Sequence, residues 1–165
     1  MTVTLYKSIY CDMDKCIGCR ACELACTEHH YKNYSPRRSR IRGVHLGEEI
    51  RVAMACRLCY RPGEKAPCVL SCPKDALRQS LADGTILLED EKCTGCGWCI
   101  LACDMGLITF DAVQNVPNIC NLCGEEEEPR CVKACLVDAL TVTTEDLFSG
   151  KSRAKSVTDL IAKAG

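Results

Sequence analysis

The chain has 165 residues, a formal net charge of −1 at pH 7 and 17 cysteines, while only 5% of its residues are aromatic. The near-zero charge excludes the basic field that binding to nucleic acid or to an anionic membrane requires. A cysteine content this high requires disulfides, zinc sites or iron–sulfur clusters. Because large side chains are few, bound metal is expected to fill much of the interior.

The N-terminal segment and the most apolar run decide the expected compartment. Residues 1–12 have no basic start followed by an apolar stretch and a small-residue cleavage site, so they do not resemble a secretory signal. The most apolar run, residues 97–103, is far shorter than the roughly 20 residues of a membrane span. We therefore expect no membrane span and a cytoplasmic location. A reducing compartment and the odd cysteine count both argue against disulfides.

Sixteen of the cysteines fall into four sets with two alternating patterns. The first and third sets are continuous runs with two, two and three residues between successive cysteines. The second and fourth sets replace the middle gap by a loop of 8 or 7 residues. In chain order the sets are Cys16, Cys19, Cys22 and Cys26; Cys56, Cys59, Cys68 and Cys72; Cys93, Cys96, Cys99 and Cys103; and Cys120, Cys123, Cys131 and Cys135.

This spacing favours [4Fe-4S] clusters over zinc. Two-residue gaps allow three thiolates to reach three irons of one cubane. The fourth cysteine, three residues further on, serves the other cluster of a pair in the bacterial ferredoxin run. A zinc site instead joins two Cys-x2-Cys pairs in one tetrahedron, which leaves the triple runs unexplained. A zinc-binding interaction module is kept as an alternative.

Short β segments follow the last three sets. Residues 86–88, 108–110 and 140–143 are apolar or β-branched and are bounded by turn residues, which predicts small antiparallel pairs that cover the clusters. Only 20 residues separate the second set from the third, so these two sets are expected to close one two-cluster unit. The first and fourth sets then close another unit around it.

The predicted fold is therefore α+β, with duplicated bacterial-ferredoxin-like units, each holding two [4Fe-4S] clusters, and one unit inserted in the other. Small antiparallel strand pairs and short helices surround four clusters. Residues 1–55 and 104–145 form the outer unit and residues 56–103 form the inner unit.

Residues 146–165 lie beyond the cluster-binding pattern. A polar hinge is expected at residues 149–152, and Ser156 with Asp159 resembles the capping pair of a helix N-terminus. Apolar residues recur at helical spacing and predict a short amphipathic helix in this tail: Val157, Leu160, Ile161 and Ala164. That apolar face either folds back on the cluster domain or docks on a neighbour.

Several residues have no expected cluster role. Cys11 is interpreted as a buried structural thiol, and Trp98 is given no special function. The three histidines are expected in surface or loop roles, because sixteen cysteines already suffice. Glutamates 125–128 are interpreted as a solvated loop. The arginines between the first two sets are either a solvated face or a docking site for a partner: Arg37, Arg38, Arg40 and Arg42.

The four sets, in this order and with looped second and fourth members, resemble the four-cluster electron-transfer subunits of molybdenum and tungsten oxidoreductases. Residues 66–69 and 129–132 also resemble that family, and the likeness covers roughly residues 11–145. Its members include subunits of formate dehydrogenases, hydrogenase-linked complexes, carbon monoxide dehydrogenase complexes and tungsten aldehyde oxidoreductases. The compact form of this chain most resembles the small subunit of a multisubunit tungsten aldehyde oxidoreductase.

The resemblance implies that ligation crosses between sets. The implied ligands are Cys16, Cys19, Cys22 and Cys135 for cluster 1; Cys26, Cys120, Cys123 and Cys131 for cluster 2; Cys56, Cys59, Cys68 and Cys103 for cluster 3; and Cys72, Cys93, Cys96 and Cys99 for cluster 4. The clusters would form a wire between a catalytic tungsten or molybdenum pterin subunit and an external acceptor or donor. A further redox subunit or copies of the chain are other implied partners.

No catalytic constellation or phosphate-binding loop is visible in the sequence, so the chain is expected to serve a catalyst without being one. A free soluble polyferredoxin is the alternative from another class. The near-neutral charge and the appended tail favour a subunit of a stable complex over a free carrier.

Overall fold

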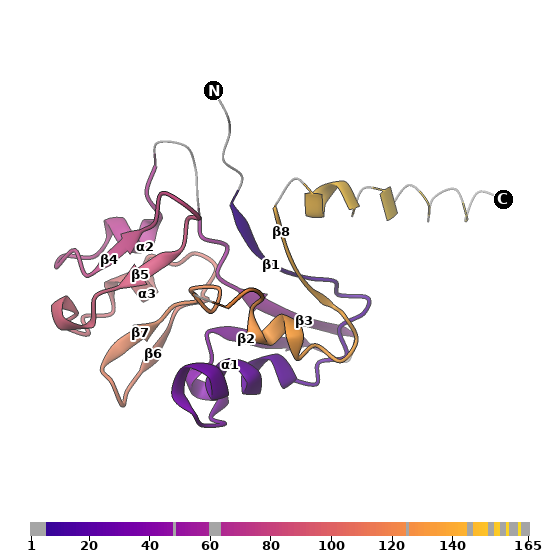
Figure 1. Cartoon of the computed structure of the whole chain (residues 1–165), viewed down its shortest axis with the longest axis horizontal. Coiled ribbons are helices and arrows are strands. Elements are labelled where there is room, and N and C mark those ends of the chain that lie inside the picture. The colour runs from indigo at the N-terminus through magenta and orange to yellow at the C-terminus, as the bar shows by residue number, and fades with distance from the viewer. Residues whose placement is uncertain are drawn as a thin grey trace.

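The computed structural model describes residues 6–47, 49–59, 64–124, 126–144 and 147–151, together with residues 154, 155, 158 and 162. Its elements are short (Figure 1). In chain order they are β1 (Lys7–Cys11), α1 (Ala21–Tyr31), η1 (Pro36–Arg38), β2 (Ile41–Leu46), β3 (Ile50–Ala55), α2 (Pro67–Leu70), β4 (Leu77–Gln79), β5 (Ile86–Leu88), η2 (Asp90–Lys92), α3 (Trp98–Leu101), β6 (Thr109–Asp111), β7 (Val116–Asn118), α4 (Arg130–Lys133) and β8 (Leu140–Thr144).

The described strands form four two-stranded antiparallel sheets, so the predicted small antiparallel pairs are confirmed. β2–β3, β4–β5 and β6–β7 are hairpins of consecutive strands. β1 instead pairs with β8, with Cys11 opposite Leu140. Figure 1 shows the β4–β5 and β6–β7 hairpins with α2 and α3 in one part of the molecule, and β1, β3 and β8 in the other. The architecture is that of an α+β, ferredoxin-like fold.

Two hydrophobic clusters form the core, and both are built around cysteine side chains. The first gathers Ile9, Ile41, Ala53, Ala55 and Leu140 around Cys22, Cys26, Cys120 and Cys131. The second gathers Ala66, Val69, Leu77, Ile86, Ile108 and Ile119 around Cys68 and Cys99. Cys56 packs against both clusters and joins them. The cysteines are therefore a main part of the interior as well as candidate ligands.

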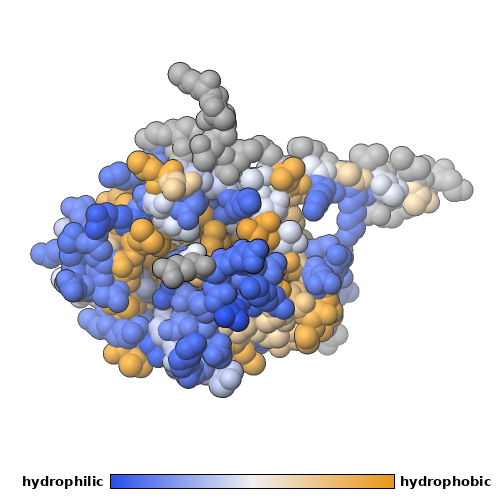
Figure 2. Space-filling model, in the orientation of Figure 1, coloured by the Kyte–Doolittle hydropathy of each residue, from blue (hydrophilic) through white to orange (hydrophobic). Residues whose placement is uncertain are grey.

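The described surface is mostly polar on the face seen in Figure 2, where hydrophobic residues form separate patches. Trp98 is 59% exposed, so it does not pack in the interior. Among the described residues, no helix has both the length and the apolar character of a membrane span.

The tail begins as a helix that packs on β1. Residues 147–151 are helical, so the hinge expected at residues 149–152 is wrong in its described part. Phe148 stacks on Tyr10 with ring centroids 4.5 Å apart, and Lys155 forms an ion pair with Asp14. The apolar residues of the predicted amphipathic helix lie outside the described residues: Val157, Leu160, Ile161 and Ala164.

Candidate iron–sulfur sites

The loops of the first and third cysteine sets share one backbone conformation. Gly18 and Gly95 each precede the second cysteine of their set, with φ of +71° and +67°. Directly after that cysteine, Arg20 (φ 61°) and Gly97 (φ 78°) take the left-handed conformation again and cap α1 and α3. Left-handed residues on both sides of a cysteine turn the backbone sharply, so the loop curls around one centre.

The second and fourth sets share a different conformation. Leu58 and Cys59 have φ of 61° and 41°, and Leu122 and Cys123 have φ of 56° and 64°. The left-handed region costs an L residue about 1 to 2 kcal/mol. Strain of this kind persists where the surrounding structure holds it, and it gathers at functional sites.

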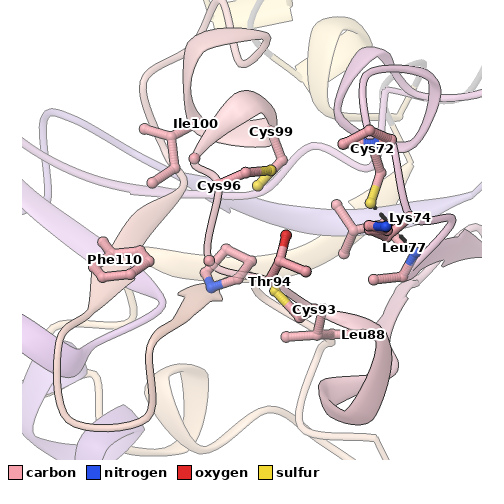
Figure 3. Close-up of a pocket in the computed structure, with 15 residues that line it drawn as sticks. Cys72, Lys74, Leu77, Leu88, Cys93, Thr94, Cys96, Cys99, Ile100 and Phe110 are labelled. Carbon is pink, nitrogen blue, oxygen red and sulfur yellow. Dashed lines mark hydrogen bonds between the residues drawn. The ribbon is translucent and has the colours of Figure 1, made fainter.

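Three of the implied cysteine groupings line three separate cavities. Cys135 lines a cavity with the first three cysteines of the first set, and Cys103 lines one with those of the second set. Cys72 lines another with those of the third set, and the four sulfurs face a shared space in Figure 3. The spaces measure about 420, 380 and 400 Å³ in that order, including their openings to solvent. We call them sites 1, 3 and 4, after the implied clusters.

The remaining four cysteines also converge, and we call their grouping site 2. Cys26, Cys120 and Cys131 belong to the first hydrophobic cluster. Burial raises the pKa of the Cys131 thiol, and repulsion from Cys120, Cys26 and Cys123 raises it further. The last cysteine of the first set therefore lies among the first three cysteines of the fourth set.

The protonation of the buried thiols shows what these sites require. Burial raises the pKa to about 12 for Cys22, Cys68 and Cys120 and to about 11 for Cys56 and Cys99. Because a buried thiolate is poorly solvated, these groups stay protonated near neutral pH until a metal displaces the proton. Convergent, buried cysteines around a cavity are the donor set of an iron–sulfur cluster, so the residues fit that cofactor.

The spread of the sulfurs distinguishes a cluster from a single zinc ion. Four thiolates on one zinc ion lie about 3.8 Å apart, since each Zn–S bond is about 2.3 Å long. A cubane spreads its ligands over a larger volume than a single ion does. The three cavities, each lined by four cysteines and measuring about 380 to 420 Å³ with their openings, fit the larger group.

Backbone amides point at several of the sulfurs. Among the described residues, amide nitrogens that lie 3.2 to 3.5 Å from a cysteine sulfur of the four sets include those of Arg40 with Cys26, Leu58 with Cys56, Ala76 with Cys72, Arg130 with Cys123 and Ala139 with Cys135. Such hydrogen bonds stabilise thiolate charge and raise the reduction potential of a bound cluster.

Neighbouring sites approach each other in a fixed order. Cys22 of site 1 lies in the first hydrophobic cluster with Cys120 and Cys131 of site 2, and Cys56 of site 3 packs against that cluster. Cys68 of site 3 and Cys99 of site 4 lie together in the second hydrophobic cluster. At the two ends of this series, Cys19 and Cys96 are the exposed members of sites 1 and 4.

Cys11 lies closer to a site than the sequence indicated. It is half-buried, its sulfur accepts the Ala53 amide at 3.4 Å, and it interacts with Cys16 and Cys135 of site 1. Burial raises the pKa of Cys11 to about 11. It therefore borders site 1 as a protonated thiol.

Two histidines also lie nearer to a site than a surface role implies. The ring nitrogens of His29 and His30 lie within 4.8 Å of the Cys123 sulfur. Desolvation lowers the pKa of His30 to about 3, with help from the charge of Arg40, so the ring is neutral. The positions of both histidines on α1, three and four residues after Cys26, were the available sequence signal, because such residues share a helix face.

The two charged segments form internal contacts. Glu126 bonds Arg130 at 2.7 Å and lies 3.8 Å from Lys133, which ties its loop to α4. The side chains of three of the four arginines bond within the chain: Arg38 to Asp111, Arg40 to Tyr31, and Arg42 to Pro36, Arg37 and Thr109. Sequence reasoning left these arginines undecided, because two of their partners, Asp111 and Thr109, lie 73 and 67 residues away along the chain.

Comparison with known proteins agrees with this chemistry. An LdpA iron–sulfur cluster-binding domain model matches residues 56–116, and a 4Fe-4S binding domain model matches residues 13–32. The polyferredoxin-like subunit of an aliphatic sulfonate oxidoreductase from Pyrococcus furiosus is 38% identical over 134 residues, which cover 79% of this chain and 74% of that subunit. The electron transport protein HydN of Escherichia coli strain K12 is 33% identical over 160 residues and is covered to 86%.

Solved structures agree as well. A chain of the active-site complex BamBC of benzoyl coenzyme A reductase is similar with a TM-score of 0.51 and 32% identity, over 86% of this chain and 77% of that one. The cysteine sites, the two domain matches and the relatives, which match about four fifths of this chain, all indicate the same cofactor and role. The chain belongs to the family of ferredoxin-like iron–sulfur proteins that serve oxidoreductases as electron-transfer subunits.

Proposed function

We propose that the chain holds four [4Fe-4S] clusters, one in each of sites 1 to 4, and conducts electrons along them. The observation that carries the proposal is the crossing of the sets. In sites 1, 3 and 4, the last cysteine of one set lines a cavity with three cysteines of another. This is the ligation of paired clusters in bacterial ferredoxins, where the fourth cysteine serves the neighbouring cluster.

The order of conduction is proposed to be 1, 2, 3, 4. Shared packing supports this order: the first hydrophobic cluster brings together cysteines of sites 1 and 2 with Cys56 of site 3, and the second brings together Cys68 of site 3 and Cys99 of site 4. Electrons would enter or leave at the ends, beside the exposed Cys19 and Cys96. The protein then has two redox ports at opposite ends of one wire.

The residues of the chain perform the supporting chemistry. A bound cluster supplies one-electron transfer at a potential that its surroundings set. The cysteines hold it as thiolates, while backbone amides of residues such as Ala76 and Ala139 donate to sulfur and offset the added negative charge. Buried apolar residues of the two core clusters exclude water from the sulfurs.

We propose two ferredoxin-like units, as predicted from the sequence, with the inner unit inserted in the outer one. The second hydrophobic cluster includes Ile108 and Ile119, so the proposed inner unit continues beyond residue 103 through the β6–β7 hairpin. Repeated backbone features support a duplication: left-handed Leu58 and Leu122 occupy equivalent positions, as do Asp75 and Asp138, which both have φ of 49°.

The proposed partner is the catalytic subunit of an oxidoreductase, of the tungsten or molybdenum pterin type that the sequence resembles. The relatives support a subunit role: one is the polyferredoxin-like subunit of a sulfonate oxidoreductase, and the structural neighbour belongs to an active-site complex. A free polyferredoxin is the second candidate. It is favoured by the relative that is named only as an electron transport protein. With seventeen free cysteines, we propose that the chain assembles in the reducing cytoplasm.

Metal analysis tests the cofactor content. Anaerobically purified protein is expected to contain about sixteen iron and about sixteen labile sulfide per chain, as four cubanes require. Stoichiometric zinc without labile sulfide would eliminate the proposal. If aerobically purified protein contains zinc in place of iron, an anaerobic preparation made in parallel serves as the control.

Crossed ligation is tested with two alanine variants. Cys135→Ala should damage the cluster of site 1 and leave site 2 with a full set of ligands, whereas Cys120→Ala should damage site 2. Paramagnetic resonance of the reduced variants then shows two different missing signals. The same missing signal in both would mean that each set binds its own cluster.

A further inference from the structure

The arginines of the first linker reach across the molecule to the β6–β7 hairpin. Arg38 donates to the Asp111 carboxylate from Nε at 2.8 Å and from Nη2 at 2.5 Å. Arg42 Nη2 donates to the Thr109 hydroxyl at 2.9 Å. Tyr31, on α1, donates its hydroxyl to Asn118 Oδ1 at 2.5 Å. Three side chains from α1, η1 and β2 thus bond the two strands of one hairpin.

This contact is buried and closely fitted. The side chains of Asp111 and Arg38 are 1% and 17% exposed, and the Arg38 guanidinium lies 3.9 Å from the ring centre of Tyr31. The second carboxylate oxygen of Asp111 accepts the amides of Val113 and Gln114 at 2.9 and 3.3 Å. A buried charge with every partner in place fixes geometry, and loss of one partner leaves the other uncompensated.

The two faces of the hairpin have different neighbours. Thr109 pairs with Asn118 across the strands, and Asp111 pairs with Val116, so these residues share the face that the linker bonds. Phe110 and Pro117 pair with each other on the opposite face, and both line site 4. Figure 3 shows Phe110 at the edge of the space around the cysteines of site 4.

The turn of the same hairpin also contacts site 4. Gly95, between two cysteines of that site, has no room for a side chain, because a Cβ there would lie 2.6 to 2.8 Å from atoms of Asn115. Asn115 is held in the left-handed conformation, with φ of 59°, at the turn that follows Asp111. One rigid hairpin therefore carries the linker contact on one side and part of the wall of site 4 on the other.

We propose that Arg38 is a positioning residue for the cluster of site 4, because it anchors through Asp111 the hairpin that walls this site. The inference rests on the proposed function, since it requires a cluster in site 4. It assigns Arg38, which precedes the first ligand of site 4 by 34 residues, a role in the redox chemistry of the far end of the wire.

The test compares Arg38→Ala with Arg37→Ala in the full chain. Arg37 is the neighbouring, exposed arginine and serves as the matched control. The signal of cluster 4 is first identified as the one altered in Cys96→Ser. Arg38→Ala is expected to shift this signal and raise the reduction potential of cluster 4, since water that enters beside Phe110 stabilises the reduced cluster. The signal assigned to site 1 through Cys19→Ser should stay unchanged.

A conservative variant separates positioning from folding. Arg38→Lys keeps the charge but loses the two-nitrogen donation and the flat contact with Tyr31, so its shift of cluster 4 should be smaller than that of Arg38→Ala. An Arg38→Ala protein indistinguishable from Arg37→Ala would overturn the inference. Equal loss of all cluster signals in both Arg38 variants would also overturn it, since it would show a general folding role. Failure of the proposed function is separate, because it appears as missing clusters in the unaltered protein.

Discussion

Gly18 is a position in a cluster-binding loop where the neighbouring side chains leave room only for glycine. Its φ is +71°, and a Cβ at this position would lie 2.7 Å from the His45 imidazole and 2.9 Å from Arg51 Cδ. These two residues face each other across the β2–β3 hairpin. The hairpin thus packs on the loop of site 1 much as the β6–β7 turn packs on the loop of site 4.

We predict that Gly18→Ala reduces both stability and cluster retention at site 1. The left-handed conformation costs alanine about 1 kcal/mol, and displacement of His45 adds to this cost. Gly97→Ala is the matched control: its φ is +78°, but no atom lies within 4 Å of its Cβ position. The rate of iron release to a chelator and the thermal midpoint of the holoprotein measure the difference. Equal effects of both substitutions would show that the contact with His45 is unimportant.

Cys11 leads to a second prediction at the residue scale. Its thiol is half-buried next to site 1 and accepts the Ala53 amide, but it has no place in the four ligand groups. Cys11→Ser, which keeps a hydrogen-bonding group, is expected to preserve the iron content and to alter at most the signal of cluster 1. Iron analysis and resonance spectra check this. Loss of about four iron atoms would make Cys11 a ligand.

Among the elements, the β6–β7 hairpin depends on its charged contact with the linker. Burial raises the pKa of the Asp111 carboxyl, but the hydrogen bond from Arg38 and two backbone amides outweigh burial, so the pKa is lowered from its ordinary value of 3.8. A lowered pKa means that the stabilisation is fully present above the pKa of the unfolded chain. It is lost only as the pH falls through the folded value.

Asp111→Asn should therefore lower the free energy of unfolding by about 3 kcal/mol, because it leaves the largely buried Arg38 without its charged partner. The loss should stay constant between about pH 5 and pH 8, because the carboxyl of the natural protein stays ionised throughout this range. Denaturant unfolding of anaerobic holoprotein at several pH values within this range, where the clusters survive, measures it. A loss that grows toward acid would contradict the assigned direction of the pKa shift.

For the whole molecule, cluster binding and folding are expected to be one process. Both core clusters are built around cysteines, and the pKa of buried thiols such as Cys22 is raised to about 12 in the absence of metal. The free energy of cluster binding is then largely folding free energy. Removal of iron with a chelator under reducing conditions should abolish the native circular dichroism spectrum. It should also abolish the protection of backbone amides from hydrogen exchange. A compact apoprotein with a cooperative melting transition would refute this coupling.

Local features of the chain were readable from its sequence. Ligand spacing is a property of a few consecutive residues, so the cofactor type followed from the cysteine runs alone. The strand expected at residues 86–88 has the bounds of β5, and those expected at 108–110 and 140–143 overlap β6 and β8. These strands carry their own signal, because apolar and β-branched residues between turns favour extended structure wherever they lie.

The tertiary structure decided what depends on distant residues. The pairing of β1 with β8, the cover of Gly18 by His45 and the bond between Arg38 and Asp111 leave no mark in local composition. Each joins segments whose contact forms only when the chain folds around its cysteines. The local sequence around an arginine in a polar linker is the same whether the side chain faces water or a buried carboxylate 73 residues away. The sequence by itself therefore determined the cofactor type and predicted the ligands, while only the fold determined which residues surround each site, since those contacts act through space and not along the chain.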